Sequence, residues 1–358
     1  MKYCSIIYVI VLCCCLYSID TVIGNVIVPK TRGSSGLPKV YYADEHLKKH
    51  SIDSSTFDNI LLSSSTVFIP VTSKGDSFVK KVSALSSSSL LDPIFLNKDH
   101  LSKDHYDNSQ FVYLGTRTNE HSNPTVHYVA VSFDSDDYPT VLKDNVIKGN
   151  LRTFGEDLKD NDAALLSTAR GMILFHSNTK FCSSCGSQTI SYKAGSARKC
   201  TNKDCRKSHY PRIEPASIML VVSKCNQYCL LGRKKEWIKG RYSTLAGFLE
   251  LGETMEMCMI RETLEESNVR IDPNSVQIIG TQPWLFPSSL MVGFFGVAQE
   301  DGLPSITIQE NEMEDVRWFH RNEILKALSS NGENGDLNFP GKSSLGRYLI
   351  NKWCEDHQ

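Results

Sequence analysis

One stretch of sequence decides the fold: residues 245–269 read LAGFLELGETMEMCMIRETLEESNV. Gly247 and Gly252 bracket a predicted loop, because glycine permits the tight backbone geometry that turns need. The run from Thr254 to Ser267 mixes polar and apolar residues at helical spacing and predicts a helix. The sequence therefore predicts a glycine loop that leads directly into an acidic helix.

Three carboxylates of this helix fall on one side. At 100° per residue, Glu262, Glu265 and Glu266 share a face, and we expect the opposite face to pack on a sheet through Met257, Ile260 and Leu264. Like charges at these spacings repel by a few tenths of a kcal/mol per pair, on the order of 0.2–0.5. A divalent cation would offset that repulsion, and hard carboxylate oxygens select Mg²⁺ or Mn²⁺. A solvated acidic face is the alternative, and it would suffice if the glutamates stood alone.

The glutamates belong to a longer pattern, Gly247-x5-Glu253-x7-Arg261-Glu262-x2-Glu265-Glu266. The pattern resembles the Nudix box of hydrolases that split a nucleoside diphosphate linked to another moiety. Two positions depart from that box, because Thr263 replaces an aliphatic residue and Asn268 replaces the usual glycine after the helix. Neither is a charged position, and asparagine is the next best residue for a left-handed helix end.

A second motif consists of four cysteines before this region, Cys182-x2-Cys185 and Cys200-x4-Cys205, separated by fourteen residues. The spacing is typical of a zinc ribbon, in which two tight turns direct pairs of thiolates at one structural Zn²⁺. Free or disulfide-bonded cysteines are the alternative. Basic residues surround the motif and are either solvated or bind nucleic acid: Lys193, Arg198, Lys199, Lys203, Arg206 and Lys207.

A third motif, downstream of the helix, indicates the branch of the family. Residues 281–289 read TQPWLFPSS and resemble the Gln-Pro-Trp-x-Phe-Pro-x-Ser segment of the NADH pyrophosphatase branch, with Leu285 in place of the usual proline. The same branch carries a four-cysteine zinc ribbon and then a Tyr-Pro-Arg segment, found here at residues 210–212. On aromatic content alone, a loop that covers the core is the favoured alternative.

The resemblance implies roles for individual residues. Glu262 and Glu266 would be metal ligands, and Glu265 a further ligand or the base that orients water. Glu253 and Arg261 complete the catalytic group, with Arg261 orienting the carboxylates. Glu312 would be a metal ligand from outside the box, although an exposed acid is nearly as good an explanation. Substrate contacts are implied for Tyr210, Ala246, Phe248, Gln282, Pro283, Trp284, Leu285, Phe286, Pro287, Ser288, Ser289 and Gly346.

Composition is that of a globular protein: 358 residues, 41% of them hydrophobic and 22% charged. With 39 basic and 40 acidic residues, no global field draws the chain onto nucleic acid. The predicted fold class is α+β, a Nudix α/β/α sandwich with a mixed sheet, preceded by a zinc ribbon and an N-terminal α+β domain. The predicted divisions are a leader at 1–24, an N-terminal domain at 45–175, the ribbon at 178–212 and the Nudix domain at 213–350.

Hydrophobic patterns predict elements on both sides of the ribbon. Residues 111–115 and 126–133 predict a hairpin, and residues 160–175 a helix that runs into the cysteines. After the ribbon, residues 217–222 and 228–232 predict strands of a second domain.

The N-terminus is apolar, with 17 uncharged residues from Tyr3 to Ile19. This run predicts a signal peptide or a short anchor, because it is shorter than a membrane-spanning helix usually needs. Family resemblance instead suggests an intracellular compartment, so localisation is left open. Beyond this segment we expect no stable membrane partner.

The activity that the resemblance implies is hydrolysis of the pyrophosphate bond of NADH or NAD⁺ to nicotinamide mononucleotide and AMP, with Mg²⁺ or Mn²⁺. One alternative is removal of NAD caps from RNA. Another is a nucleotide- or RNA-binding zinc-ribbon module without catalysis. The resemblance also suggests a homodimer.

Overall fold

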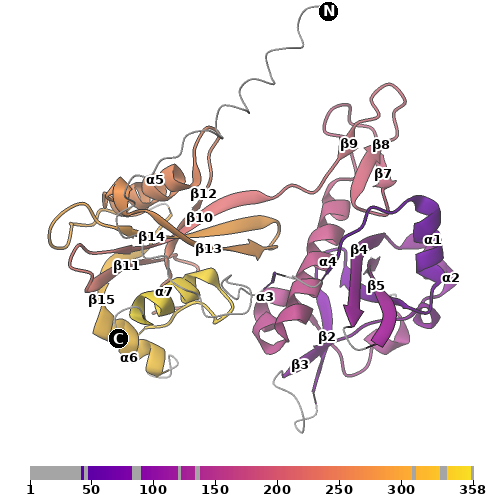
Figure 1. The fold of residues 1–358 in the computed structure, drawn as a ribbon, viewed down its shortest axis with the longest axis horizontal. Coiled ribbons are helices and arrows are strands. Elements are labelled where there is room, and N and C mark those ends of the chain that lie inside the picture. Colours follow the sequence, from indigo (N-terminus) through magenta and orange to yellow (C-terminus); the bar gives the residue numbers. More distant parts are fainter. Residues whose placement is uncertain are drawn as a thin grey trace, which may run out of the picture. The chain divides into compact units, whose positions relative to one another are not determined.

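The computed structural model describes residues 42–43, 47–82, 90–119, 122–133, 138–308, 312–330 and 337–355 (Figure 1). The predicted leader at residues 1–24 lies outside these ranges. Within them, no helix combines the length and the apolar character that crossing a membrane requires.

The first part of the chain builds a six-stranded mixed sheet. Its strands are β1 (Thr66–Thr72), β2 (Ser77–Lys81), β3 (Leu91–Pro93), β4 (Phe111–Asn119), β5 (Ser122–Phe133) and β6 (Ile147–Gly149). The order is β3-β2-β1-β5-β4, with β6 beside β2, and β1 and β5 run parallel. The antiparallel pairing of β4 with β5 confirms the predicted hairpin.

Helices cover both faces of this sheet. They are α1 (Ser54–Leu62), α2 (Lys103–Asn108), α3 (Leu151–Phe154) and α4 (Asp160–Asn178), with short 3-10 turns at Lys98–His100, Thr140–Leu142 and Gly155–Asp157. Helix α4 buries Ala163, Leu166 and Ile173 against one face, and α1 contributes Ile60 to the core on the other. The predicted helix at 160–175 is confirmed and continues to Asn178.

Helix α4 leads into the ribbon, by which we mean residues 178–212. Its strands β7 (Thr189–Tyr192), β8 (Ala197–Cys200) and β9 (Ser208–His209) form an antiparallel sheet in that order. Gly186 and Gly195 have φ angles of 73° and 87°. Both lie in the left-handed region that favours glycine, which explains their place in the two turns.

The second large sheet also has six strands: β10 (Glu214–Val222), β11 (Tyr228–Arg233), β12 (Leu245–Phe248), β13 (Gln277–Trp284), β14 (Ser289–Val297) and β15 (Asp315–His320). Their order is β13-β14-β10-β11-β15, with β12 beside β10. Strands β10 and β14 run parallel and the other pairs antiparallel, so the sheet is mixed as predicted.

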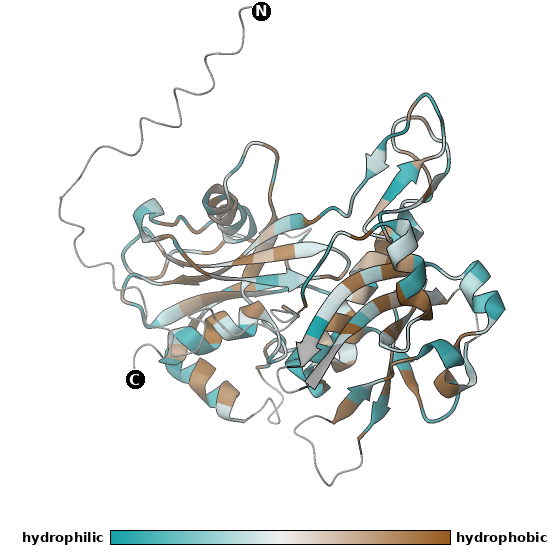
Figure 2. Ribbon diagram, turned by 45° about the vertical axis from the view of Figure 1, so that its right-hand side comes forward, coloured by the Kyte–Doolittle hydropathy of each residue, from teal (hydrophilic) through white to brown (hydrophobic). Residues whose placement is uncertain are grey.

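Helices lie on both faces of this sheet as well (Figure 1): α5 (Met255–Ser267) on one, and α6 (Arg321–Ser329) and α7 (Leu345–Glu355) on the other, with a 3-10 turn at Pro273–Ser275. Strand β10 serves both cores, because Met219 packs with α5 while Leu220 packs with α6 and α7. Each such side chain contributes roughly 1.5–3 kcal/mol on burial. Figure 2 shows hydrophobic and hydrophilic residues mixed along the strands of both large sheets. The predicted α/β/α sandwich is confirmed.

Candidate active site

Helix α5 is defined at both ends by local hydrogen bonds. The Thr254 side chain accepts a hydrogen bond from the backbone N–H of Met257 and caps the start. At the other end, Asn268 adopts the left-handed conformation at φ 60° and ψ 15°, and its N–H donates to the Leu264 carbonyl. Asparagine therefore fills the glycine position of the Nudix box without breaking the helix end, as the sequence predicted.

Gly247 lies in strand β12, and the predicted loop begins after Phe248, at the end of this strand. The strand pairs with β10, and the carboxyl group of Glu262 sits directly above the Gly247 backbone. A Cβ atom at residue 247 would lie 1.8 Å from Glu262 Cδ. Glycine is needed here because the carboxylate occupies the space of a side chain. Gly252 does lie in the turn that follows, with a φ of 93°.

Arg261 donates hydrogen bonds to three of the carboxylates, those of Glu253, Glu262 and Glu265. Its Nε donates to Glu253 Oε1 at 2.6 Å, and one terminal nitrogen donates to both Glu262 and Glu265 at 2.9 Å. The other terminal nitrogen donates to the Phe248 carbonyl at 3.0 Å. The hydrogen bond from Arg261 lowers the pKa of Glu253, and the same bond raises the pKa of Arg261. This is the geometry expected of a residue that orients carboxylates.

Glu266 is the most deeply placed of these acids, with 2% of its surface exposed. Its Oε2 is buried and has no hydrogen-bond partner. Burial raises the pKa of Glu266 to about 8, and repulsion from Glu262 and Glu312 acts in the same direction. A buried carboxylate oxygen without a partner is costly for the fold, so its chemistry fits a cation ligand.

Two charged residues outside the Nudix box, Glu312 and Lys234, interact electrostatically with Glu266. Glu312 lies before β15 and is close enough that its charge raises the pKa of both Glu262 and Glu266, whose pKa values are raised chiefly by burial. Lys234 follows β11, and its positive charge lowers the pKa of Glu266. Sequence reasoning proposed Glu312 but missed Lys234. A basic residue directly after a central strand was the available signal.

The predicted packing of α5 on the sheet is right for Ile260, which packs against the core, and wrong for the other two residues. Met257 and Leu264 are exposed, whereas Cys258, Met259, Thr263 and Glu266 are buried. The helix therefore turns its carboxylate side toward β12 and the sheet, because Glu262 must lie on Gly247. Thr263 is tolerated in the core since its hydroxyl donates to the Met259 carbonyl at 2.8 Å.

The aromatic segment, residues 281–289, makes its contacts with α7 and with the first sheet. Gln282 is buried, donating to the Ser343 carbonyl and accepting from the Leu345 N–H, so it fixes the start of α7. Trp284 and Phe286 pack edge-on against Tyr42, with ring centroids 5.9 and 5.5 Å away. The two rings thus contact the core of the first sheet rather than the carboxylates.

The other residues expected to contact substrate come from several elements. Pro283 lies in β13, Ser289 begins β14, and Leu285, Pro287 and Ser288 connect them. Gly346 lies in α7 next to Ser243 and Thr244. The Ala246 backbone hydrogen bond lowers the pKa of Glu266, whose burial raises it. Phe248 and Tyr210 are exposed.

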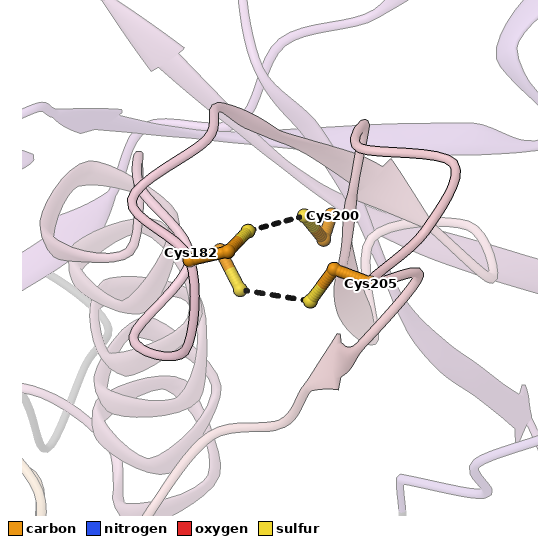
Figure 3. Close-up of side chains that lie close together, drawn as sticks. Cys182, Cys200 and Cys205 are labelled. Atoms are coloured by element: carbon orange, nitrogen blue, oxygen red, sulfur yellow. Dashed lines mark hydrogen bonds between the residues drawn. The ribbon is translucent and has the colours of Figure 1, made fainter.

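The four cysteines converge from the two turns of the ribbon. Their sulfur atoms all lie within 4.8 Å of one another, with Cys182 3.7 Å from Cys205 and Cys185 3.5 Å from Cys200 (Figure 3). In a tetrahedron with Zn–S bonds of about 2.3 Å, neighbouring sulfurs are about 3.8 Å apart. The four thiols are free, so the donor set and its size fit Zn²⁺.

Local hydrogen bonds and burial tune these thiols differently. Hydrogen bonds donated by Ser187 lower the pKa of Cys185 to about 6, whereas burial raises the pKa of Cys200 to about 12. His209 Nε2 lies 3.3 Å from Cys182 Sγ. Among the described residues, the cysteines are the single group of three or more candidate ligands gathered this tightly, because the glutamates are drawn onto Arg261.

Comparison with known proteins identifies the class that this fold and site define. Residues 213–337 match the NUDIX domain, so the chain contains a NUDIX domain. Several relatives are named NAD-capped RNA hydrolases. The protein NUDT12 of Macaca fascicularis is 38% identical over 202 residues, covering 55% of this chain and 42% of that protein.

Two further relatives bear the same name. The NAD-capped RNA hydrolase of Schizosaccharomyces pombe is 37% identical over 227 residues, covering 58% of this chain and 59% of that protein. NudC of Mycobacterium bovis is 34% identical over 212 residues, covering 58% and 66%. The chain thus spans about half the length of the curated relatives it matches. A solved NUDIX hydrolase from Nitrosomonas europaea aligns at 23% identity and a TM-score of 0.33, covering 45% of this chain and 96% of that one.

Proposed function

We propose that the chain hydrolyses the pyrophosphate bond of NADH or NAD⁺, giving nicotinamide mononucleotide and AMP, with a divalent cation held by the α5 carboxylates. The observation that carries the proposal is Glu266, whose buried oxygen lacks any partner within the described structure. The relatives named NAD-capped RNA hydrolases support an NAD-containing substrate.

A pyrophosphate resists water because its anionic oxygens repel the attacking nucleophile. Glu262 and Glu266, held beside β12, would bind Mg²⁺ or Mn²⁺, and Glu312 faces them from outside the helix. The bound ion would neutralise the diphosphate and lower the pKa of a water molecule. Hydrogen bonds of 2.9 Å from Arg261 Nη1 to a carboxylate oxygen of Glu262 and of Glu265 fix the positions of these two side chains.

In this proposal Glu265 would accept the proton of the attacking water. Its side chain is 48% exposed, so solvent reaches it, while Arg261 fixes its orientation. Lys234 is close enough for its charge to oppose the effect of burial on the pKa of Glu266, and it would contact an anionic phosphate. The exposed ring of Phe248 is free to stack on a base or nicotinamide ring.

Replacement of the two helix carboxylates tests this assignment. We expect Glu265→Gln and Glu266→Gln each to lower NADH turnover by a factor of roughly 10² or more, the scale of general acid–base and charge stabilisation. Products would be separated by chromatography for NADH, NAD⁺ and ADP-ribose with Mg²⁺ or Mn²⁺. Glu256→Gln is the matched control, because Glu256 is exposed in the first turn of α5. Unchanged turnover in both variants would remove these residues from the mechanism.

Removal of NAD caps from RNA is a second candidate for the same site. Two observations favour it: the names of the relatives, and the basic residues of the ribbon. Rates on free NADH and on NAD-capped RNA, measured with the same preparation, decide between the two substrates. We also propose that the ribbon holds Zn²⁺. A homodimer and the leader's function stay predictions from the sequence.

A further inference from the structure

The ribbon sheet has two chemically different faces. Thr189 pairs with Cys200 and Ile190 pairs with Lys199 in the register of β7 and β8. Because side chains alternate along a strand and directly paired residues share a face, Ile190, Tyr192 and Lys199 lie on one side. Thr189, Arg198, Cys200 and His209 lie on the other.

The second of these faces is fully engaged within the molecule. Cys200 belongs to the cysteine group, and His209 contacts Cys182 Sγ. Arg198 donates to the Nδ1 atom of His176 at 2.9 Å and to the Thr189 carbonyl at 2.6 Å. This side therefore serves the metal site and the attachment to α4, and we call it the inner face.

The other side, the outer face, carries apolar side chains that are open to solvent, although Ala197, which pairs with Tyr192, is buried on it. Ile190, Tyr192 and, just beyond β9, Tyr210 are 57%, 37% and 54% exposed. Lysines lie over both rings: Lys199 Nζ is 5.1 Å from the Tyr192 centroid, and Lys193 Nζ is 5.7 and 5.8 Å from the centroids of Tyr192 and Tyr210. Outward strand positions normally carry polar residues, so this clustering of rings and ammonium groups calls for a ligand.

The charge of the ribbon contrasts with that of the rest of the chain. Residues 178–212 contain eight basic residues and one acidic residue, Asp204. The remainder then holds 31 of the 39 basic and 39 of the 40 acidic residues. Even with four thiolates around a divalent ion, a local charge of −2, the ribbon stays basic. A polyanion is thus attracted here although the whole chain carries a charge of −1.

We propose that the outer face of the ribbon is a binding site for single-stranded RNA, with bases stacking on Tyr192 and Tyr210 and phosphates contacting Lys193 and Lys199. Aromatic rings bind any unpaired base through its flat face, and nearby ammonium groups bind the backbone. In a duplex the base faces are stacked on one another, so they cannot stack on the two tyrosine rings. Only the expected effect on capped RNA rests on the proposed function, because binding of RNA to this face requires no cap.

Binding is tested with the full-length chain and an uncapped, unstructured 12-nucleotide RNA by fluorescence anisotropy. Tyr192→Ser should weaken binding by about tenfold, the scale of a single base–aromatic stack, whereas Tyr192→Phe should bind as tightly as the wild type. Lys199→Glu should weaken binding and flatten the dependence of log K on log salt concentration by about 0.7 for each phosphate that the variant no longer neutralises. Lys326→Glu on α6 makes the same charge change at a site outside the ribbon and should have no effect.

The consequence for catalysis separates this site from the active site. In Tyr192→Ser and Lys199→Glu, kcat/KM for NAD-capped RNA should fall while kcat/KM for NADH stays at the wild-type value. Wild-type RNA affinity in both variants would overturn the proposal, as would binding of duplex RNA or anionic phosphatidylserine vesicles in preference to single strands. If the wild type binds uncapped RNA but hydrolyses neither NADH nor capped RNA, the proposed function fails and the RNA site stands.

Discussion

Glu266 and Arg261 together set the electrostatics of the active site. Removing a carboxylate from water costs several kcal/mol unless charges or hydrogen bonds compensate. Arg261 compensates Glu253, Glu262 and Glu265 through direct contacts, but it makes none with Glu266. The uncompensated acid has its pKa raised to about 8, because it is buried. Such a residue is retained at a cost to stability, which fits a role in binding a cation.

Gly247 is the smallest residue of the site and the one with the sharpest steric requirement. We expect Gly247→Ala to displace Glu262, at a cost of about 1–3 kcal/mol in stability, because the new Cβ would overlap the carboxyl group. Displacing a metal ligand by about 1 Å should lower kcat/KM by roughly 10²-fold. Denaturant unfolding and NADH turnover measure the two effects.

Gly149→Ala is the matched control for that substitution. Gly149 ends β6, and a Cβ there would meet Phe154 at 3.5 Å, an ordinary contact. Its turnover should equal that of the wild type. Equal turnover in the two alanine variants would show that the space above Gly247 is not needed by Glu262.

At the scale of elements, the ribbon is attached to α4 by a buried hydrogen-bond network. His176 of α4 contacts the Gly195 carbonyl through Nε2 at 2.7 Å and Arg198 through Nδ1 at 2.9 Å. Arginine only donates, so Nδ1 must accept, and Nε2 carries the proton. Protonation of His176 Nδ1 would place its N–H opposite the N–H of Arg198, and neither group could accept a hydrogen bond. Burial accordingly lowers the pKa of His176 from 6.5 to about 4.

This shift makes the attachment sensitive to acid. The unfolded chain binds a proton at His176 near pH 6.5 and the folded chain only near pH 4, so stability is lost as pH falls through that window. Between pH 7.5 and 5.5 the loss should be about 1 kcal/mol. Urea unfolding at both pH values checks it, with His176→Gln as the control, because an amide can accept and donate without titrating. An equal pH dependence in the two proteins would contradict the assignment.

At the scale of the whole molecule, two sheets with helices on both faces are joined through the ribbon segment. The parts also make direct contacts: Arg170 of α4 donates to the Leu285 carbonyl at 2.5 Å, and Ser343 donates to Glu156 through its N–H at 2.8 Å. The ribbon differs from both sheets, because in Figure 2 its strands are largely hydrophilic. It holds too few buried apolar side chains to be stable by burial alone.

Metal removal should therefore unfold the ribbon selectively. We expect a strong chelator to abolish the hydrogen-exchange protection of the β7 and β8 amides while the central strands β1 and β10 keep theirs, because metal binding supplies the folding energy of such segments. Cys200→Ser should reproduce this effect. Cys225→Ser should not, since Cys225 is exposed and outside the cysteine group. Persistent protection of β7 and β8 after complete chelation would show that the ribbon needs no metal.

Local features followed from the sequence alone. The start of α4, the extent of α5 and the left-handed end at Asn268 depend on residues a few positions apart, and the convergence of the ribbon cysteines depends on the spacing within each pair. Propensity, capping and ligand spacing act over that range, so a single sequence contains the information. The mixed sheet and the helices around it also followed, because the Nudix-box resemblance implies them.

Only the tertiary structure decided which side of α5 is buried, why residue 247 is glycine, and that the charge of Lys234 acts on Glu266. It also placed Trp284 and Phe286 against Tyr42, about 240 residues earlier in the chain, and His176 against Arg198. These contacts join segments that are distant in sequence, and helical periodicity gives the spacing of a face without its direction. Which face of a helix is buried depends on the space that the neighbouring strand leaves. At β12, Gly247 leaves space for the carboxylate of Glu262.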